Sequence, residues 1–225
     1  KALHINEYTI GALSNIAVTA SAVTANSNGT WTIAFSGTPT LTRVFKNDKF
    51  ADSAGKAWKV LSVAPSVYKI IVVDSEGNTP TVSAPVTGAG TVGRWYASIS
   101  AWEAGRNADI TANSRNAIER GLPYYDGAPD TTTVNIDGWS TDATHYIEIY
   151  VPLSERHRGK WDTSRYRLEL TKTQIEKGIR KTKAFNHRLE PNEDKNGIIT
   201  IDDSYNGNPD GVHAIIGFLS SIKGH

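Results

Sequence analysis

The sequence predicts a mainly β protein: a small N-terminal antiparallel β barrel or sandwich, followed by a short, irregular β-helix-like or β-sandwich domain with a few short helices. Three observations support this fold class. Many short segments alternate polar and apolar residues, which is typical of strands with one buried face. Turn residues separate these segments at short intervals. The hydrophobic fraction of 39% and the charged fraction of 21% are those of a soluble globular protein.

The first 92 residues are rich in Ala, Thr, Ser and Val and contain three clear strand patterns. These are Thr30–Phe35, Ala57–Val63 and Val67–Val73, and the turn at Pro65 and Ser66 joins the last two. Hairpin turns of this kind connect antiparallel strands. We therefore expect a small antiparallel β domain over residues 25–79.

Residues 1–24 have few strand breakers and alternate apolar with small polar residues. Such a segment can pair with an open sheet edge of another chain. The alternative is a first strand of its own domain. Residues 80–93 contain two prolines and three glycines, a composition typical of linkers, so they predict the boundary before a second domain over residues 94–225.

The second domain begins with a predicted helix. Ser100 and Glu103 have the spacing of a capping box, and Ile99 and Trp102 fall on one face of the helix. Three strand patterns follow at Thr133–Trp139, Thr144–Val151 and Arg165–Leu170. The C-terminal residues Val212, Ile215, Ile216, Leu219 and Ile222 fit an amphipathic helix, with a further buried strand as the alternative.

The order of two sequence segments resembles a known architecture. "GRWYASISAWEAGRNADI" followed by "TVNIDGWSTDATHYIEIYVPLSERHRGKWDTSRYRLEL" resembles the N-terminal capping region of right-handed parallel β-helix, pectate-lyase-like proteins of phage and bacterial surfaces. The resemblance implies that Trp102 lies beneath a helical cap. It also implies that Ile136, Ile147, Ile149 and Leu168 point into the stack of coils.

Composition excludes several function classes. The net charge of +1 leaves no global field that would collect nucleic acid. No apolar run is long enough to span a membrane. The chain has no cysteine, so disulfides, thiolate chemistry and zinc-thiolate sites are absent. Because the chain begins at Lys1 and has no methionine, proteolytic processing or a fragment is expected.

The basic residues are unevenly distributed. Between Ser154 and Lys195 there are twelve Lys and Arg residues against seven Asp and Glu residues. A solvated, loop-rich face accounts for this segment better than a polyanion site, because acidic residues are interleaved with the basic ones.

One segment has the spacing of a calcium-binding loop. Asn192, Asp194, Asn196 and Asp203 occupy ligand positions around Gly197 in a twelve-residue pattern. Calcium is therefore the one cofactor that the sequence suggests. The alternative is a polar turn that leads into a strand at Ile198–Ile201.

No catalytic signature is present. The sequence has no nucleophile elbow, no Ser/His/Asp context and no phosphate-binding loop, so no catalytic or cofactor-binding residue is assigned. Groups suited to sugar chemistry are present but form no signature. They are Asp137, Glu148, Glu155, His157, Arg158, Lys160 and Asp162.

Two functions fit the sequence. The first is a structural or assembly protein, a phage virion component (decoration, tail or fibre protein) or an extracellular assembly subunit, whose partners are other copies of itself or other virion or surface proteins. Its predicted subunit contacts are Ile5, Tyr8, Ile10, Val212, Ile216 and Leu219. The location is then a virion, the extracellular space or the cell surface.

The second function is a carbohydrate-active or carbohydrate-binding β-helix protein, with a cell-surface glycan as the partner. Exposed aromatic side chains would stack on sugar faces, as Trp139, Tyr146, Tyr150 and Trp161 could do.

Overall fold

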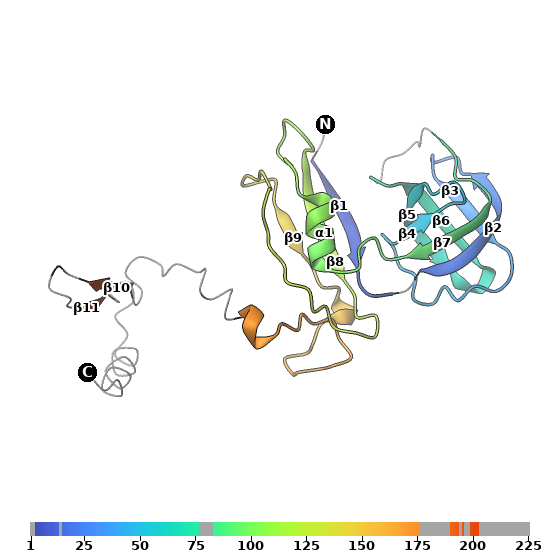
Figure 1. Ribbon diagram of the computed structural model, residues 1–225. Coiled ribbons are helices and arrows are strands. Elements are labelled where there is room, and N and C mark those ends of the chain that lie inside the picture. The colour runs from blue at the N-terminus through green and yellow to red at the C-terminus, as the bar shows by residue number, and fades with distance from the viewer. Residues whose placement is uncertain are drawn as a thin grey trace. The chain divides into compact units, whose positions relative to one another are not determined.

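The computed structural model describes residues 3–13, 15–76, 83–175, 190–193, 195 and 199–202. The chain divides into two compact units, residues 1–170 and residues 171–225. Figure 1 shows strands as the main element of the first unit, with one short helix packed on a sheet. The prediction of a mainly β protein with few helices is confirmed.

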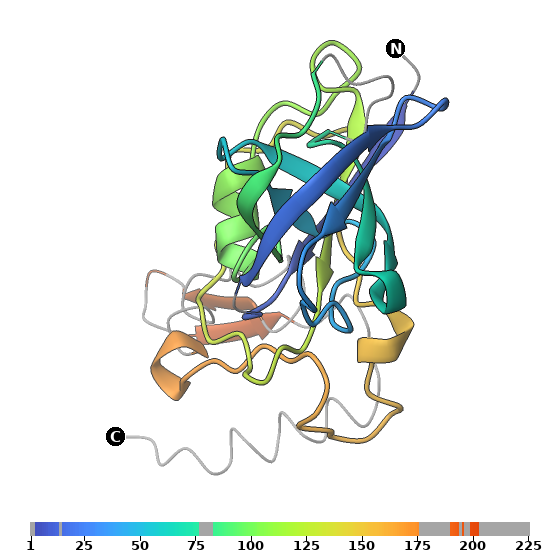
Figure 2. The ribbon, with the colours of Figure 1, turned by 90° about the vertical axis from the view of Figure 1, so that its right-hand side faces the viewer.

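Residues 16–93 form a closed antiparallel barrel of six strands (Figure 2). The strands are β2 (Ile16–Ala25), β3 (Trp31–Phe35), β4 (Lys49–Ala51), β5 (Ala57–Ala64), β6 (Lys69–Asp74) and β7 (Gly88–Gly93), in the order β2-β3-β6-β5-β4-β7 around the barrel. A 3₁₀ turn, η1 (Pro65–Val67), joins β5 to β6. The core consists of fully buried side chains, among them Ile33, Phe50, Trp58, Val60 and Val72. Closure leaves the barrel without an open strand edge.

The segment predicted to be a linker, residues 80–93, contains the strand that closes this barrel. β7 pairs with β2 on one side and β4 on the other. A Cβ atom on Gly90 would lie 2.4 Å from the carbonyl oxygen of Ala51, so glycine allows the two strands to approach closely. The glycines that suggested a linker therefore serve strand packing.

The rest of the first unit is built on a parallel sheet. Its strands are β1 (His4–Ile10), β8 (Ala117–Pro123) and β9 (Ile147–Ile149), with β8 in the middle. The helix α1 (Ile99–Arg106) packs on β1 and β8 (Figure 1). Ser98 caps it, because its hydroxyl accepts a hydrogen bond from the backbone N–H of Ala101 at 3.0 Å.

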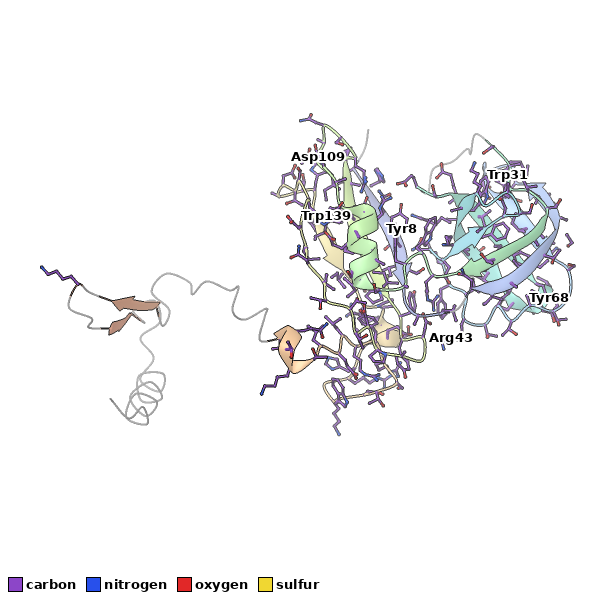
Figure 3. The ribbon with its side chains drawn as sticks, viewed as in Figure 1. Tyr8, Trp31, Arg43, Tyr68, Asp109 and Trp139 are labelled. Atoms are coloured by element: carbon purple, nitrogen blue, oxygen red, sulfur yellow. The ribbon has the colours of Figure 1, made fainter. Side chains whose placement is uncertain are left out.

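The capping box predicted for Ser100 and Glu103 does not form. Glu103 is buried and instead accepts hydrogen bonds from Trp139 Nε1 at 3.2 Å and from the backbone N–H of Asp137 at 3.1 Å. This carboxylate attaches residues 137–139 to α1, and Figure 3 shows Trp139 beside the helix.

The β-helix-like domain is not shown. The described residues form a closed barrel and a three-stranded parallel sheet, and of the three strand patterns predicted after residue 130 only residues 147–149 form a strand. Trp102 is fully buried but lies in α1 itself, and Ile136, Ile149 and Leu168 are 48%, 43% and 40% exposed instead of lying in a stack. Alternation of polar and apolar residues could not reveal that the segment of Leu168 forms a single bridge, to Asp130, and that Ile149 lies on the exposed side of a three-residue strand.

A repeated turn holds much of residues 107–170 without strands. In four places an Asp carboxylate accepts hydrogen bonds from both the backbone N–H and the hydroxyl of the residue two positions later. The aspartates are Asp109, Asp130, Asp142 and Asp162. These local bonds fix the backbone where regular strands are short or absent, and two of the aspartates, Asp109 and Asp130, also form isolated β-bridges with Ser140 and Leu168.

The second unit contains a hairpin of β10 (Glu190–Glu193) and β11 (Ile199–Asp202), in which Glu190 pairs with Asp202. In the described part of the chain, no helix has the length and apolar character needed to cross a membrane.

A buried arginine connects the barrel to the sheet. Arg94 follows β7, and its guanidinium donates to Asp48 at 2.8 Å and to Asp126 at 2.8 Å, with all three side chains almost fully buried. Burial disfavours the charged guanidinium, but the hydrogen bonds to Asp126 and the charge of Asp48 outweigh it and raise the pKa of Arg94. The guanidinium also lies over the stacked rings of Phe45 and Tyr124.

Replacing Arg94 with Met is expected to lower the free energy of unfolding by about 3–5 kcal/mol, because two buried carboxylates lose their cation. Arg43→Met is the matched control. Arg43 also binds Asp126, but its side chain is 48% exposed, so the expected loss is under about 1 kcal/mol. Urea unfolding of both variants measures the difference, and equal losses would contradict the role given to Arg94.

Candidate functional site

An open pocket of about 470 Å³ lies at the end of β9. Its lining combines aromatic, aliphatic and charged side chains: Ile149, Tyr150, Val151, Glu155, Arg156, His157 and Tyr166. Pockets that bind small molecules have this composition, with apolar walls and a few polar groups that fix orientation.

The backbone around the pocket is fixed by β9 and by the short turn that follows it. The N–H of Tyr150 donates to the carbonyl of Gly121 at 2.9 Å, which extends the pairing of β9 with β8. The 3₁₀ turn η2 (Leu153–Glu155) then reverses the chain. Arg156 Nε donates to the carbonyl of Val151 at 2.7 Å, so the two ends of the turn are held together across the pocket wall.

Two arginines flank the ring of Tyr150. The guanidinium carbons of Arg120 and Arg156 lie 5.3 Å and 4.8 Å from the ring centroid. Arg120 is itself held by Glu7 of β1 at 2.9 Å and by Glu148 of β9 at 2.8 Å. The ring is thus positioned by cation–π contacts whose charges are anchored on two strands.

The other two polar walls are also held in place. Tyr166 donates its hydroxyl to Asp130 at 3.3 Å, and burial raises the pKa of Tyr166, so the phenol stays protonated as a donor. Glu155 accepts the backbone N–H of Tyr125 at 2.8 Å. The pocket therefore has fixed walls, which lowers the ordering cost of binding a ligand.

The chemistry of the lining favours binding over hydrolysis. Glycoside hydrolysis uses two carboxylates on opposite sides of the bond, and Glu155 is the single carboxylate among the lining residues. In the described part of the chain, no group of three or more His, Cys, Asp or Glu side chains could hold a metal ion. Arg156, His157 and Glu155 remain as hydrogen-bonding groups toward a ligand.

A second cluster of ionisable groups lies between the barrel and the sheet. Tyr8 is sandwiched between Lys59 of β5, at 4.1 Å from its ring centroid, and Arg106 of α1, at 4.4 Å (Figure 3). Arg106 also donates to Glu119 at 2.7 Å. Lys59 is 4% exposed and Glu119 is fully buried, so no substrate reaches them and the cluster serves to join the two parts.

A His–Asp pair also resembles catalytic machinery. His145 Nδ1 lies 2.8 Å from Asp142, but its Nε2 lies 2.8 Å from the side-chain oxygen of Asn116. Both ring nitrogens are thus occupied, and the ring is 6% exposed. The pair is structural.

The predicted calcium ligands fall largely outside the described residues. Asn192 lies in β10, where it pairs with Thr200 of β11, whereas Asp194, Asn196 and Asp203 are not among the described residues. Calcium binding stays a prediction.

The predicted subunit contacts of the N-terminal segment are mostly internal. Tyr8 and Ile10 are buried in the core under α1, because β1 pairs along its whole length with β8 of the same chain. This is a correction in favour of the alternative, a strand of its own domain. Ile5 is 47% exposed. Val212, Ile216 and Leu219 lie outside the described residues.

The sequence identified part of the pocket. Tyr150, Glu155 and His157 were among the residues suited to sugar binding, and the structure brings them together. Arg156 and Tyr166 were missed, because nothing in the local pattern shows that residue 166 returns to residue 150. Trp139, by contrast, packs on Trp102 at 5.7 Å and belongs to the core.

No protein family and no curated protein matches this chain. Among solved structures, it is similar to a siderophore-interacting protein from Acinetobacter baumannii, with 11% identity, a TM-score of 0.23, and coverage of 92% of this chain and 97% of that one. A siderophore-interacting protein from Aeromonas hydrophila gives 10% identity, a TM-score of 0.23, and coverage of 92% and 99%. A TM-score of 0.23 is too low to transfer a fold or a function.

The prediction of a phage virion component or assembly subunit is contradicted. The prediction rested on a parallel β-helix, and the described residues form a small closed barrel and a three-stranded parallel sheet instead. The strand expected to pair with a neighbouring subunit is used within the chain. That function is therefore withdrawn.

The buried Lys59 predicts a measurable pH dependence of stability. Burial lowers the pKa of Lys59 to about 8, from 10.5 when the lysine is exposed. Between these values the unfolded chain binds a proton that the folded chain does not, so stability rises with pH. The gain over this range is about 3 kcal/mol, and it is absent below pH 8, where both states are protonated.

Lys59→Met removes the titrating group and should abolish this rise relative to wild type. The exposed Lys69 of β6 supplies the control, since Lys69→Gln should leave the rise intact. Urea midpoints at pH 7 and pH 10 provide the measurement. An unchanged slope in Lys59→Met would refute the assignment.

Proposed function

We propose that this protein binds a glycan and holds one of its sugar units in the pocket at the end of β9. The observation that carries the proposal is the convergence of two tyrosine rings with Arg156, His157 and Glu155 around one open cavity. A sugar ring has an apolar face and a rim of hydroxyl groups. Tyr166, Ile149 and Val151 offer apolar surface for the face, Tyr150 borders it with its ring between two arginines, and the three charged or polar side chains offer donors and an acceptor for the rim.

The competing polar clusters support this choice by being satisfied internally. The buried Arg94 pairs with Asp48 and Asp126, and Arg106 pairs with the buried Glu119. Both ring nitrogens of His145 have hydrogen-bond partners. Buried charges that pair with each other serve the fold. In the pocket, His157 and Arg156 are instead exposed to solvent.

A glycan ligand agrees with the extracellular or cell-surface location expected from the sequence, which remains a prediction. It involves neither a virion nor a β-helix.

Replacing Tyr150 with Ala is expected to weaken glycan binding by about tenfold to a hundredfold, equivalent to about 1.4–2.8 kcal/mol, because the ring between Arg120 and Arg156 is lost. A glycan array, followed by isothermal titration with the best ligand, measures the change.

Tyr146→Ala is the matched control for this test. Tyr146 is 44% exposed and close in sequence, but it does not line the pocket, so its loss should leave affinity unchanged. Absence of binding to any glycan on the array would refute the proposal, as would equal losses in the two variants.

A further inference from the structure

The chain leaves the pocket through a strongly basic loop. Arg156 and His157 line the pocket, and Arg158 and Lys160 follow them on the same loop, all exposed. The loop ends at Trp161, whose side chain is 73% exposed. A tryptophan that is this exposed does not gain the stabilisation that burial of its large ring would give. Its position at the end of a cationic loop therefore points to a binding surface.

The positive charge of this loop is not neutralised by its neighbours. Nearby Arg165 pairs with Asp162, and Arg167 pairs with Glu169. Within the described ranges, Arg158 and Lys160 form no ion pair or hydrogen bond. The loop of Arg156, Arg158 and Lys160 therefore carries three cations, and the pocket that it adjoins has one carboxylate among its lining residues, Glu155.

The turn between Arg158 and Lys160 depends on Gly159. Gly159 has φ of +76°, a conformation that L side chains rarely adopt, and a Cβ there would meet open space. The glycine is thus required by backbone conformation and not by packing. It bends the chain between the two unpaired cations.

We propose that the ligand is an anionic glycan whose carboxylate or sulfate groups bind the loop of residues 156–161 while one sugar unit occupies the pocket. The inference rests on the proposed function and names its ligand class. Guanidinium groups match carboxylate and sulfate oxygens through paired N–H donors, and Lys160 adds a point charge. Trp161 supplies an apolar surface for a sugar unit further along the chain.

Two of the interleaved acidic residues that suggested a solvated face, Asp162 and Glu169, are accounted for by local pairing. Asp162 and Glu169 neutralise arginines other than those beside the pocket. Among the described residues from Arg156 to Glu169, the cations without an acidic partner are those of the loop that follows the pocket, which a tally of charges along the sequence does not show.

Dextran, carboxymethyl dextran and dextran sulfate of one chain length provide the test, because they share a backbone and differ in charge. At 50 mM NaCl we expect the two charged polymers to bind at least about tenfold more tightly than dextran. This preference should fall steeply at 200 mM NaCl, since exposed charges are screened.

The double variant Arg158→Gln/Lys160→Gln should lose most of the preference for charged polymers and show a flatter salt dependence. Lys46→Gln/Lys69→Gln, which removes two exposed charges from the barrel, is the charge-matched control and should behave as wild type. A supporting result requires both outcomes together with weaker binding by Tyr150→Ala.

Equal affinity for dextran and its charged derivatives would overturn the anionic preference and leave the proposed function standing. Binding of a single-stranded oligonucleotide of matched charge as tightly as dextran sulfate, unaffected by Tyr150→Ala, would reveal a general polyanion surface and overturn the inference. Failure of every glycan, on the array and in this series, would overturn the proposed function itself.

Discussion

The buried ion pairs of Arg94 are the constraint on which the first unit depends. Asp48 comes from the barrel and Asp126 from the segment after β8, and the guanidinium that they share supplies the opposite charge next to both buried carboxylates. Arg94 stands directly after β7, the strand that closes the barrel. The strand that closes the barrel is therefore followed at once by the residue that binds the segment after β8 to the barrel. Gly11 packs against the same ion pairs, since a Cβ atom on Gly11 would lie 2.1 Å from Asp126 Oδ2.

The parallel sheet connects the barrel to the pocket at the end of β9. β1 leads into the barrel, pairs with β8, and carries Glu7, which holds Arg120 against Tyr150. Glu7 also accepts from Asn47 of the barrel at 2.9 Å. The position of Tyr150 at the pocket thus depends on the ion pair between Glu7 of β1 and Arg120 of β8. The loop beyond it, at Arg158 and Lys160, has no such restraint in the described structure and can adapt to a long ligand.

A strand could be predicted from the sequence where neighbours along the chain stabilise it, and could not where its partner is distant. The predicted strands Thr30–Phe35 and Ala57–Val63 correspond to the observed Trp31–Phe35 and Ala57–Ala64, because hairpin neighbours bury their alternating apolar residues. Ile136 and Leu168 belong to the same kind of pattern but lie exposed, because neither residue lies in a strand and Leu168 forms only an isolated bridge with Asp130. Glycines 88 and 90 suggested a linker, because composition cannot distinguish flexibility from close packing of two strands.

The sequence by itself determined the mainly β character, the hairpin strands of the barrel and the local Asp-centred turns, since these depend on residues within a few positions of one another. Only the tertiary structure decided that β1 belongs to the chain's own sheet and that Arg94 joins distant carboxylates. It also decided that Tyr150, Arg156 and Tyr166 share one cavity. The physical reason is sequence separation: β1 and β8 are more than one hundred residues apart. Contacts across such distances leave no periodic trace in either segment.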